Sequence, residues 1–168
     1  RQALAENEMV LISGGSSVGM RDFTIEAFEA QSAAEIMVHG VSISPGKPTI
    51  LARSGNKPMW GIPGHVTSAM VVFRVLVAPF IAHLGGLDDR YRRVVAVTCR
   101  LGRNLPSAQG RVDFVRVRLA DRDDALIAEP VLGKSGLIHT MVKADGLLRI
   151  PADVEGLDKG DPVAVEIM

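Results

Sequence analysis

The sequence is poor in cysteine and in net charge. Its only cysteine, Cys99, has no partner for an internal disulfide or a zinc knuckle, which is typical of a reducing, cytoplasmic compartment. The 19 basic residues are balanced by 19 acidic ones. This balance argues against a general nucleic-acid binder and against attachment to an anionic membrane. We therefore expect neither nucleic acid nor a membrane as a partner.

Long uninterrupted apolar runs are also missing. The most apolar stretch, residues 68–84, has Arg74 in its middle, followed by Pro79 and His83. A membrane span needs about 18 or more consecutive apolar residues. We therefore predict a buried or interface helix over residues 66–84, kinked or weakened near Pro79 because proline lacks the N–H that a helix requires.

The chain contains two kinds of hydrophobic pattern, and the first lies before residue 85. Short apolar runs predict strands over residues 9–13, 35–43, 48–54 and 57–62. Between them, Phe23, Ala27 and Ala30 recur at helical spacing and predict the apolar face of a helix. Strands alternating with helices predict an α/β domain over residues 1–86, with a mostly parallel, helix-covered sheet.

The second pattern follows a linker of glycine and aspartate at residues 85–91. Apolar and polar residues alternate with period two over residues 92–101, 111–121, 125–131 and 161–168. In "DFVRVRL", for example, Phe114, Val115 and Val117 are set against Arg116 and Arg118. Such alternation predicts an antiparallel sheet or small β-barrel with one solvated face over residues 91–168.

The first candidate site is the loop "SGGSSVG", residues 13–19, which follows the first predicted strand. Ligands of open α/β sheets bind outside the carboxyl ends of the strands. The glycines allow close backbone approach, and their N–H groups favour an anion; the donors are Gly14, Gly15, Gly19 and the hydroxyls of Ser13, Ser16 and Ser17. A tight turn that merely needs glycine is the alternative. Asp22 is either a helix cap or a carboxylate that binds a divalent metal.

Two further loops follow predicted strands. In Pro45-Gly46-Lys47-Pro48 the prolines stiffen a loop that presents Lys47 as a cation for a phosphate or an oxyanion, unless it is an ordinary turn lysine. In Pro63-Gly64-His65 a turn opens a helix whose first N–H groups, with Ser68, also suit an anion. His65 is alternatively a cap or a packed side chain. If the three loops meet at one sheet edge, they suit a phosphate-bearing ligand, with a metal ion as an option.

These motifs, in this order, resemble the molybdopterin molybdenumtransferase family, which includes MoeA and the gephyrin E domain. The similarity rests on four stretches: residues 13–19 followed by Asp22-Phe23, residues 45–48, residues 61–69, and the sequence A-D-G-L at residues 144–147. The resemblance implies a C-terminal portion of such a protein, expected to be inactive by itself because the domains that complete the site are absent. It also implies a three-layer molybdopterin-binding α/β domain, incomplete at its N-terminus, followed by a small C-terminal β-barrel, and a homodimer.

The resemblance also implies a reaction and a set of roles. Adenylylated molybdopterin would lose AMP with the help of Mg²⁺, and molybdate would be inserted into the pterin dithiolene. Asp22 would serve metal binding and catalysis, and Lys47 would hold molybdate or a phosphate. The remaining matched positions would bind the pterin or nucleotide: Ser13, Gly14, Gly15, Ser16, Ser17, Gly19, Pro45, Gly46, Pro63, Gly64, His65 and Ser68.

The chain departs from the family pattern at several of these positions. Ser16 replaces a valine, Ser44 stands where many relatives have a basic residue, and His65-Val66 replaces Asn-Pro. These changes keep open a second hypothesis, a non-catalytic molybdopterin-binding or scaffold protein of the same fold. A third, a nucleotide amidohydrolase of the competence-damage type, is disfavoured because the second half matches the barrel of the transferases.

Overall fold

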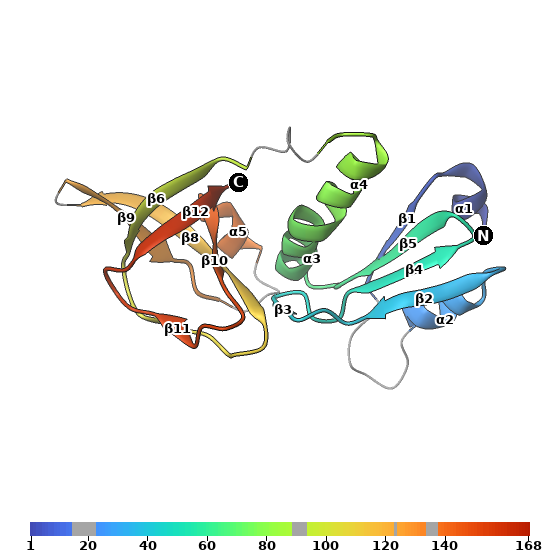
Figure 1. Cartoon of the computed structure of the whole chain (residues 1–168), viewed down its shortest axis with the longest axis horizontal. Coiled ribbons are helices and arrows are strands. Elements are labelled where there is room, and N and C mark those ends of the chain that lie inside the picture. Colours follow the sequence, from blue (N-terminus) through green and yellow to red (C-terminus); the bar gives the residue numbers. More distant parts are fainter. Residues whose placement is uncertain (15–22, 89–93, 123, 134–137) are drawn as a thin grey trace. The chain divides into compact units, whose positions relative to one another are not determined.

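The computed structural model describes residues 1–14, 23–88, 94–122, 124–133 and 138–168 (Figure 1). The chain divides into two compact units. The first consists of residues 1–41 and 46–81, and the second of residues 42–45 and 82–168. The short segment 42–45 therefore belongs to the second unit, although it lies within the sequence of the first.

The first unit contains a four-stranded sheet with the strand order β1-β5-β4-β2. Its strands are β1 (Val10–Ser13), β2 (Ala34–His39), β4 (Ile50–Ser54) and β5 (Lys57–Ile62), and helix α1 (Gln2–Glu6) precedes them. Helix α2 (Phe23–Glu29) packs beside β2. Phe28, Ile50, Ala52 and Met59 form the buried core between helix and sheet.

The prediction of a mostly parallel sheet is wrong for the described strands. Only β1 and β5 are parallel, whereas β5–β4 and β4–β2 are antiparallel. Strands β4 and β5 are joined by the two residues Gly55-Asn56, with Gly55 at φ 57°. A connection this short forces a hairpin, because parallel neighbours need a long crossover. The alternation of strands and helices gave no sign of this turn.

Helix α2 buries a different face from the one predicted. Phe23 is 61% exposed, while Thr24 and Phe28, one turn apart, are 2% and 1% exposed. Thr24 fits there because Gly61 has no side chain: a Cβ on Gly61 would lie 2.7 Å from Thr24 Cγ2. The contact of Thr24 with Gly61 of strand β5 decides which face of α2 is buried. The sequence of the helix alone does not encode this contact.

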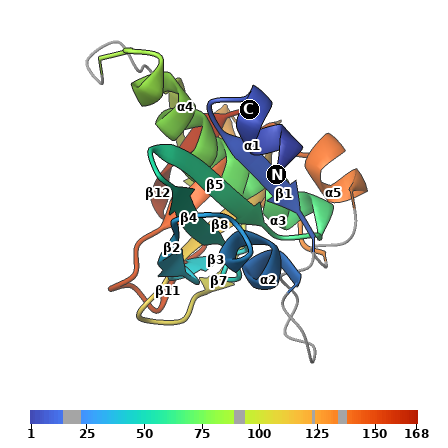
Figure 2. The same cartoon turned by 90° about the vertical axis from the view of Figure 1, so that its right-hand side faces the viewer.

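One continuous helical stretch, Val66–Leu84, follows β5 (Figure 2). It consists of α3 (Val66–Val72), the π-helical turn η1 (Phe73–Val77) and α4 (Ala78–Leu84). The π turn lies just before Pro79, which cannot donate a backbone hydrogen bond and whose ring would crowd the carbonyl one turn back. The irregularity that was predicted near Pro79 is therefore this π-helical turn. By length and composition alone, this helix is apolar enough to cross a membrane. One such helix is only weak evidence for a membrane span.

The second unit is built around a closed five-stranded barrel with the order β10-β12-β6-β9-β8, closed by pairing of β8 with β10. The barrel strands are β6 (Ala96–Leu101), β8 (Val112–Arg122), β9 (Ala125–Pro130), β10 (Gly146–Ile150) and β12 (Pro162–Ile167). Strand β3 (Ile43–Ser44) adds to β8 in parallel. A small pair, β7 (Leu105–Pro106) with β11 (Gly156–Leu157), and helix α5 (His139–Val142) complete the unit.

The barrel core explains two features of the sequence. Cys99 is 5% exposed within it, and burial raises the pKa of its thiol. The A-D-G-L motif begins β10: Asp145 Oδ2 accepts a hydrogen bond of 2.7 Å from the Leu119 N–H, and a Cβ on Gly146 would lie 2.5 Å from Val165 Cγ1. The described contacts of this motif therefore give it a structural role in closing the barrel.

Candidate functional site

The first and third predicted loops touch at one end of the parallel pair β1–β5. Strand pairing sets Ser13 beside Ile62, and the Gly14 N–H donates to the Ile62 carbonyl at 3.1 Å. The Ser13 hydroxyl lies 3.4 Å from the Pro63 carbonyl, to which it donates. A Cβ on Gly64 would lie 3.1 Å from Gly14 Cα. Glycine at position 64 therefore allows the two loop backbones to approach each other closely.

The second loop connects β2 to β4 and reaches the same sheet edge. Pairing of His39 with Ile50, and of Ile50 with Gly61, places the end of β2 and the start of β4 level with the end of β5. Lys47 is exposed beyond this edge, with neither its ammonium nor its N–H hydrogen bonded to any other described residue. Lys47 is therefore available to an anion.

Helix α3 begins at Val66, directly after the Pro63-Gly64-His65 loop. His65 is its N-cap, is exposed, and makes no side-chain capping bond. Ser68 is only 6% exposed and Pro63 is buried. Of the predicted binding residues in this loop, Gly64 and His65 are exposed, whereas Pro63 and Ser68 are buried; their binding roles stay predictions.

Several predicted site residues lie outside the described residues: Gly15, Ser16, Ser17, Gly19 and Asp22. Their roles stay predictions, including the metal-binding role of Asp22. Within the described ranges, no group of three or more His, Cys, Asp or Glu side chains is placed to hold a metal ion.

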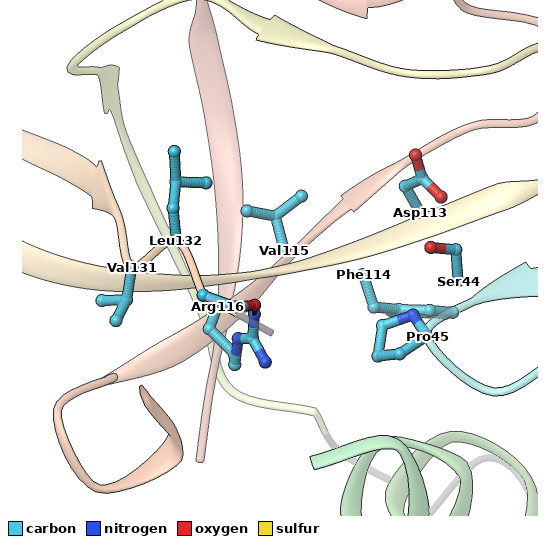
Figure 3. Close-up of a pocket in the computed structure, with 9 residues that line it drawn as sticks. Ser44, Pro45, Asp113, Phe114, Val115, Arg116, Val131 and Leu132 are labelled. Atoms are coloured by element: carbon cyan, nitrogen blue, oxygen red, sulfur yellow. Dashed lines mark hydrogen bonds between the residues drawn. The ribbon is translucent and has the colours of Figure 1, made fainter. Parts of the chain in front are cut away.

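A cavity of about 350 Å³ in the second unit contains a functional candidate that sequence reasoning missed. Its lining combines the end of β3, the middle of β8 and the segment after β9: Ser44, Pro45, Asp113, Phe114, Val115, Arg116, Val131, Leu132 and Gly133. Figure 3 shows Arg116 between Val131 and Pro45 in this cavity. Pro45 is the first residue of the Pro-Gly-Lys-Pro motif, so the motif's start forms part of the wall.

Arg116 is only partly satisfied by the protein. Its Nη2 donates to the Gly133 carbonyl at 3.1 Å. Its Nε and Nη1 are buried and have no hydrogen-bond partner among the residues that the structure describes. Burial lowers the pKa of this guanidinium, yet an arginine stays protonated at neutral pH. Arg116 lines the cavity, and a buried guanidinium with two unpaired donors is suited to an oxyanion.

The carboxylate in the cavity wall does not neutralise Arg116, because it is bound elsewhere. Asp113 is 7% exposed and accepts a 2.8 Å hydrogen bond from the Ser107 hydroxyl. Arg111 Nε lies 2.9 Å from Asp113 Oδ1. The alternation of apolar and polar residues in β8 predicted Arg116 only as a solvated residue. The cavity around Arg116 also needs β3, which is distant from β8 in the sequence.

Comparison with known proteins identifies two families along the chain. Residues 1–83 match the family described as "probable molybdopterin binding domain", and residues 98–168 match "MoeA C-terminal region (domain IV)". A Methanocaldococcus jannaschii protein, named for molybdopterin biosynthesis, is 36% identical over 100% of this chain and 38% of its own length. A Haemophilus influenzae molybdopterin molybdenumtransferase is 30% identical over 98% of this chain and 40% of its own length.

Solved structures give the same result. The molybdopterin biosynthesis MoeA protein of Pyrococcus horikoshii has a TM-score of 0.77 and 34% identity, covering 99% of this chain and 38% of that one. A molybdenum cofactor biosynthesis protein of Pyrococcus furiosus has a TM-score of 0.73 and 28% identity, covering 99% and 51%. The chain thus spans about 40% of the length of the curated relatives it matches.

Proposed function

We propose, from the premise that this chain belongs to the MoeA family of molybdopterin biosynthesis proteins, that it contributes to molybdate insertion into molybdopterin. In the proposed reaction, adenylylated molybdopterin loses AMP and its dithiolene sulfurs take up molybdenum from molybdate. The relatives named molybdopterin molybdenumtransferase support this assignment. The protein is proposed to act in the cytoplasm on a small-molecule pterin.

The observation that carries the proposal is the pair of arginine donors in the cavity of the second unit. Arg116 Nε and Nη1 are buried without a partner among the described residues, a costly arrangement that an anionic ligand would relieve. Molybdate is a tetrahedral oxyanion, and both AMP and molybdopterin carry phosphate. Arg116 is therefore assigned to bind one of these oxyanions, with Ser44 as a neighbouring hydroxyl.

In the first unit, Lys47 and the touching loops at Gly14 and Gly64 support binding of a phosphorylated pterin. Gly14 and Gly64 have no side chain between a ligand and the backbone. The Lys47 ammonium and N–H offer two donors on one residue. These groups bind and orient the anionic ends of the substrate.

Mg²⁺, when bound, would neutralise the phosphates of the adenylyl group as AMP leaves. The proposed ligand, Asp22, lies outside the described residues, and the described residues contain no metal-holding cluster. The proposed role of Asp22 in holding Mg²⁺ therefore rests on its match to the family motif.

The family and the long helix also support a homodimer. Five large apolar side chains of this helix are each at least 40% exposed: Val66, Met70, Phe73, Ile81 and Leu84. An exposed apolar stripe of this kind favours a protein interface. A second copy of the chain is the proposed partner.

The test of the proposed function is release of AMP from adenylylated molybdopterin by the parent-length protein, in the presence of molybdate and Mg²⁺. We expect Asp22→Asn to bind the substrate but to release little AMP, and Arg116→Met to weaken binding. Binding by the wild type without any turnover would favour the scaffold alternative. Absence of both binding and turnover would refute the proposal for this chain.

A further inference from the structure

Two glycines of the proposed site are each held by a hydrogen bond from a buried threonine. Gly14, at the root of the first loop, has φ 96°, and Gly46, in the second, has φ 128°. Each glycine's carbonyl accepts a hydrogen bond from a buried threonine hydroxyl: Thr24 to Gly14 at 2.8 Å, and Thr49 to Gly46 at 2.7 Å. Thr24 is 2% exposed and Thr49 is 1% exposed.

Both glycines need such a restraint. A glycine samples left-handed and right-handed backbone conformations almost equally, so holding it in one costs more entropy than for any other residue. A short hydroxyl–carbonyl bond inside the protein opposes this freedom, and because both threonine side chains are buried, bulk solvent does not compete with it.

The bond from Thr49 also sets the direction of a donor at the site. The peptide between Gly46 and Lys47 is trans and planar, so its N–H points away from the carbonyl on the same peptide. Since the Gly46 carbonyl is held toward buried Thr49, the Lys47 N–H is directed away from Thr49. The loop is further tied by the Val41 N–H to the Lys47 carbonyl at 2.9 Å and by the Gly40 N–H to the Thr49 carbonyl at 2.8 Å.

We propose that Thr24 and Thr49 are positioning residues, whose hydroxyls hold the backbone at Gly14 and the Lys47 loop in the conformation that binds the anionic substrate. The proposal rests on the function proposed above for these loops. Neither threonine needs to touch the ligand. Their hydroxyls act through the backbone, and their methyl groups act only in packing, which Thr24 shows by its contact with Gly61.

The hydroxyl and the packing can be separated with two substitutions at each position. Valine keeps the branched shape and removes the hydroxyl, whereas serine keeps the hydroxyl and removes the methyl group. A buried carbonyl left without its donor costs about 1–3 kcal/mol. If that cost falls on the binding conformation, molybdopterin affinity falls by about 5- to 150-fold.

The experiment has two readouts on the whole chain. Amide hydrogen exchange at Val41 and Gly40 reports the order of the Lys47 loop without any ligand. Titration with molybdopterin reports binding. The variants are Thr49→Val and Thr49→Ser, with Lys47→Met to test the site itself. Val163→Ala, in the barrel core at 6% exposure, is the control for a general loss of stability.

Thr49→Val is expected to accelerate exchange at Val41 and Gly40 at least fivefold and to weaken molybdopterin binding, while Thr49→Ser stays within about twofold of wild type. Val163→Ala should leave both loop amides unchanged. The same comparison at Thr24, with exchange read at the Gly14 N–H, is expected to give a smaller rescue by serine because the contact with Gly61 is lost.

Unchanged exchange and unchanged binding in Thr49→Val, with binding lost in Lys47→Met, would overturn the positioning role and leave the proposed site intact. Equal binding by wild type and Lys47→Met would instead refute the site at Lys47. The exchange readout then still decides whether Thr49 orders the loop. Serine and valine variants with equal effects would show that packing, not the hydroxyl, is responsible.

Discussion

Replacing Arg116 with methionine should strengthen the fold and weaken the function at the same time. In the absence of ligand, Arg116 keeps two charged donor atoms buried without a partner among the described residues, and gains one bond to the Gly133 carbonyl. Methionine has a similar length and flexibility and needs no hydrogen bond. The substitution therefore removes one favourable bond and two buried, unsatisfied groups.

The magnitudes of these two terms can be compared. The bond from a charged donor to Gly133 contributes about 1.5–3 kcal/mol, and each unsatisfied buried donor costs about 1–3 kcal/mol. At the midpoints of these ranges the gain exceeds the loss, so we expect the free energy of unfolding of Arg116→Met to be higher by about 2 kcal/mol. Loss of charge-assisted bonds to an oxyanion should weaken molybdate or molybdopterin binding by about 10- to 150-fold.

Urea unfolding without ligand, followed by calorimetric titration, measures both quantities. Arg118→Met is the matched control, because Arg118 lies two residues further along the same strand and is exposed. We expect this control to change neither stability nor binding appreciably. An Arg116→Met variant that lost more than about 2 kcal/mol of stability and bound as wild type does would refute the reasoning, since Arg116 would then be a structural residue.

Three further predictions concern stability and assembly. Gly146→Ala should lower the free energy of unfolding by about 1–3 kcal/mol in urea, because its Cβ would lie 2.6 Å from the Glu166 carbonyl oxygen; an unchanged midpoint would contradict this packing. The raised pKa of Cys99 means that the folded state retains its proton longer than the unfolded chain, so stability should fall as pH rises above about 8.5. Cys99→Val should remove that part of the pH dependence, and an identical profile in the variant would assign it to other groups. Phe73→Asp should shift sedimentation from dimer to monomer, and a wild type that sediments as a monomer at high concentration would exclude a dimer through this helix.

Much of the fold was predictable from local patterns. The alternation in residues 111–121 became β8, the apolar run with Trp60 became the buried strand β5, and the break near Pro79 became a π turn. These features depend on neighbours in sequence, where side-chain periodicity and missing N–H groups act directly.

The antiparallel β4–β5 pair came from the local turn Gly55-Asn56, but two other failures came from contacts between distant segments. The face of α2 was mispredicted because Gly61, far along the chain, admits Thr24 and leaves Phe23 exposed. The cavity at Arg116 arises because β3 pairs with β8, a long-range choice that no periodicity encodes. Lys47 and the glycine loops could be proposed as site residues from local sequence alone, because glycine- and proline-rich loops have recognisable motifs, and their binding roles stay predictions.

The most direct test of the central claim is an equilibrium titration of this chain with molybdopterin and its adenylylated form, with Lys47→Ala alongside. The account predicts saturable binding by the wild type and at least tenfold weaker binding by Lys47→Ala, because an exposed cation and its neighbouring loops hold the anionic substrate. Equal affinity of the two proteins, or no binding by either, would contradict it.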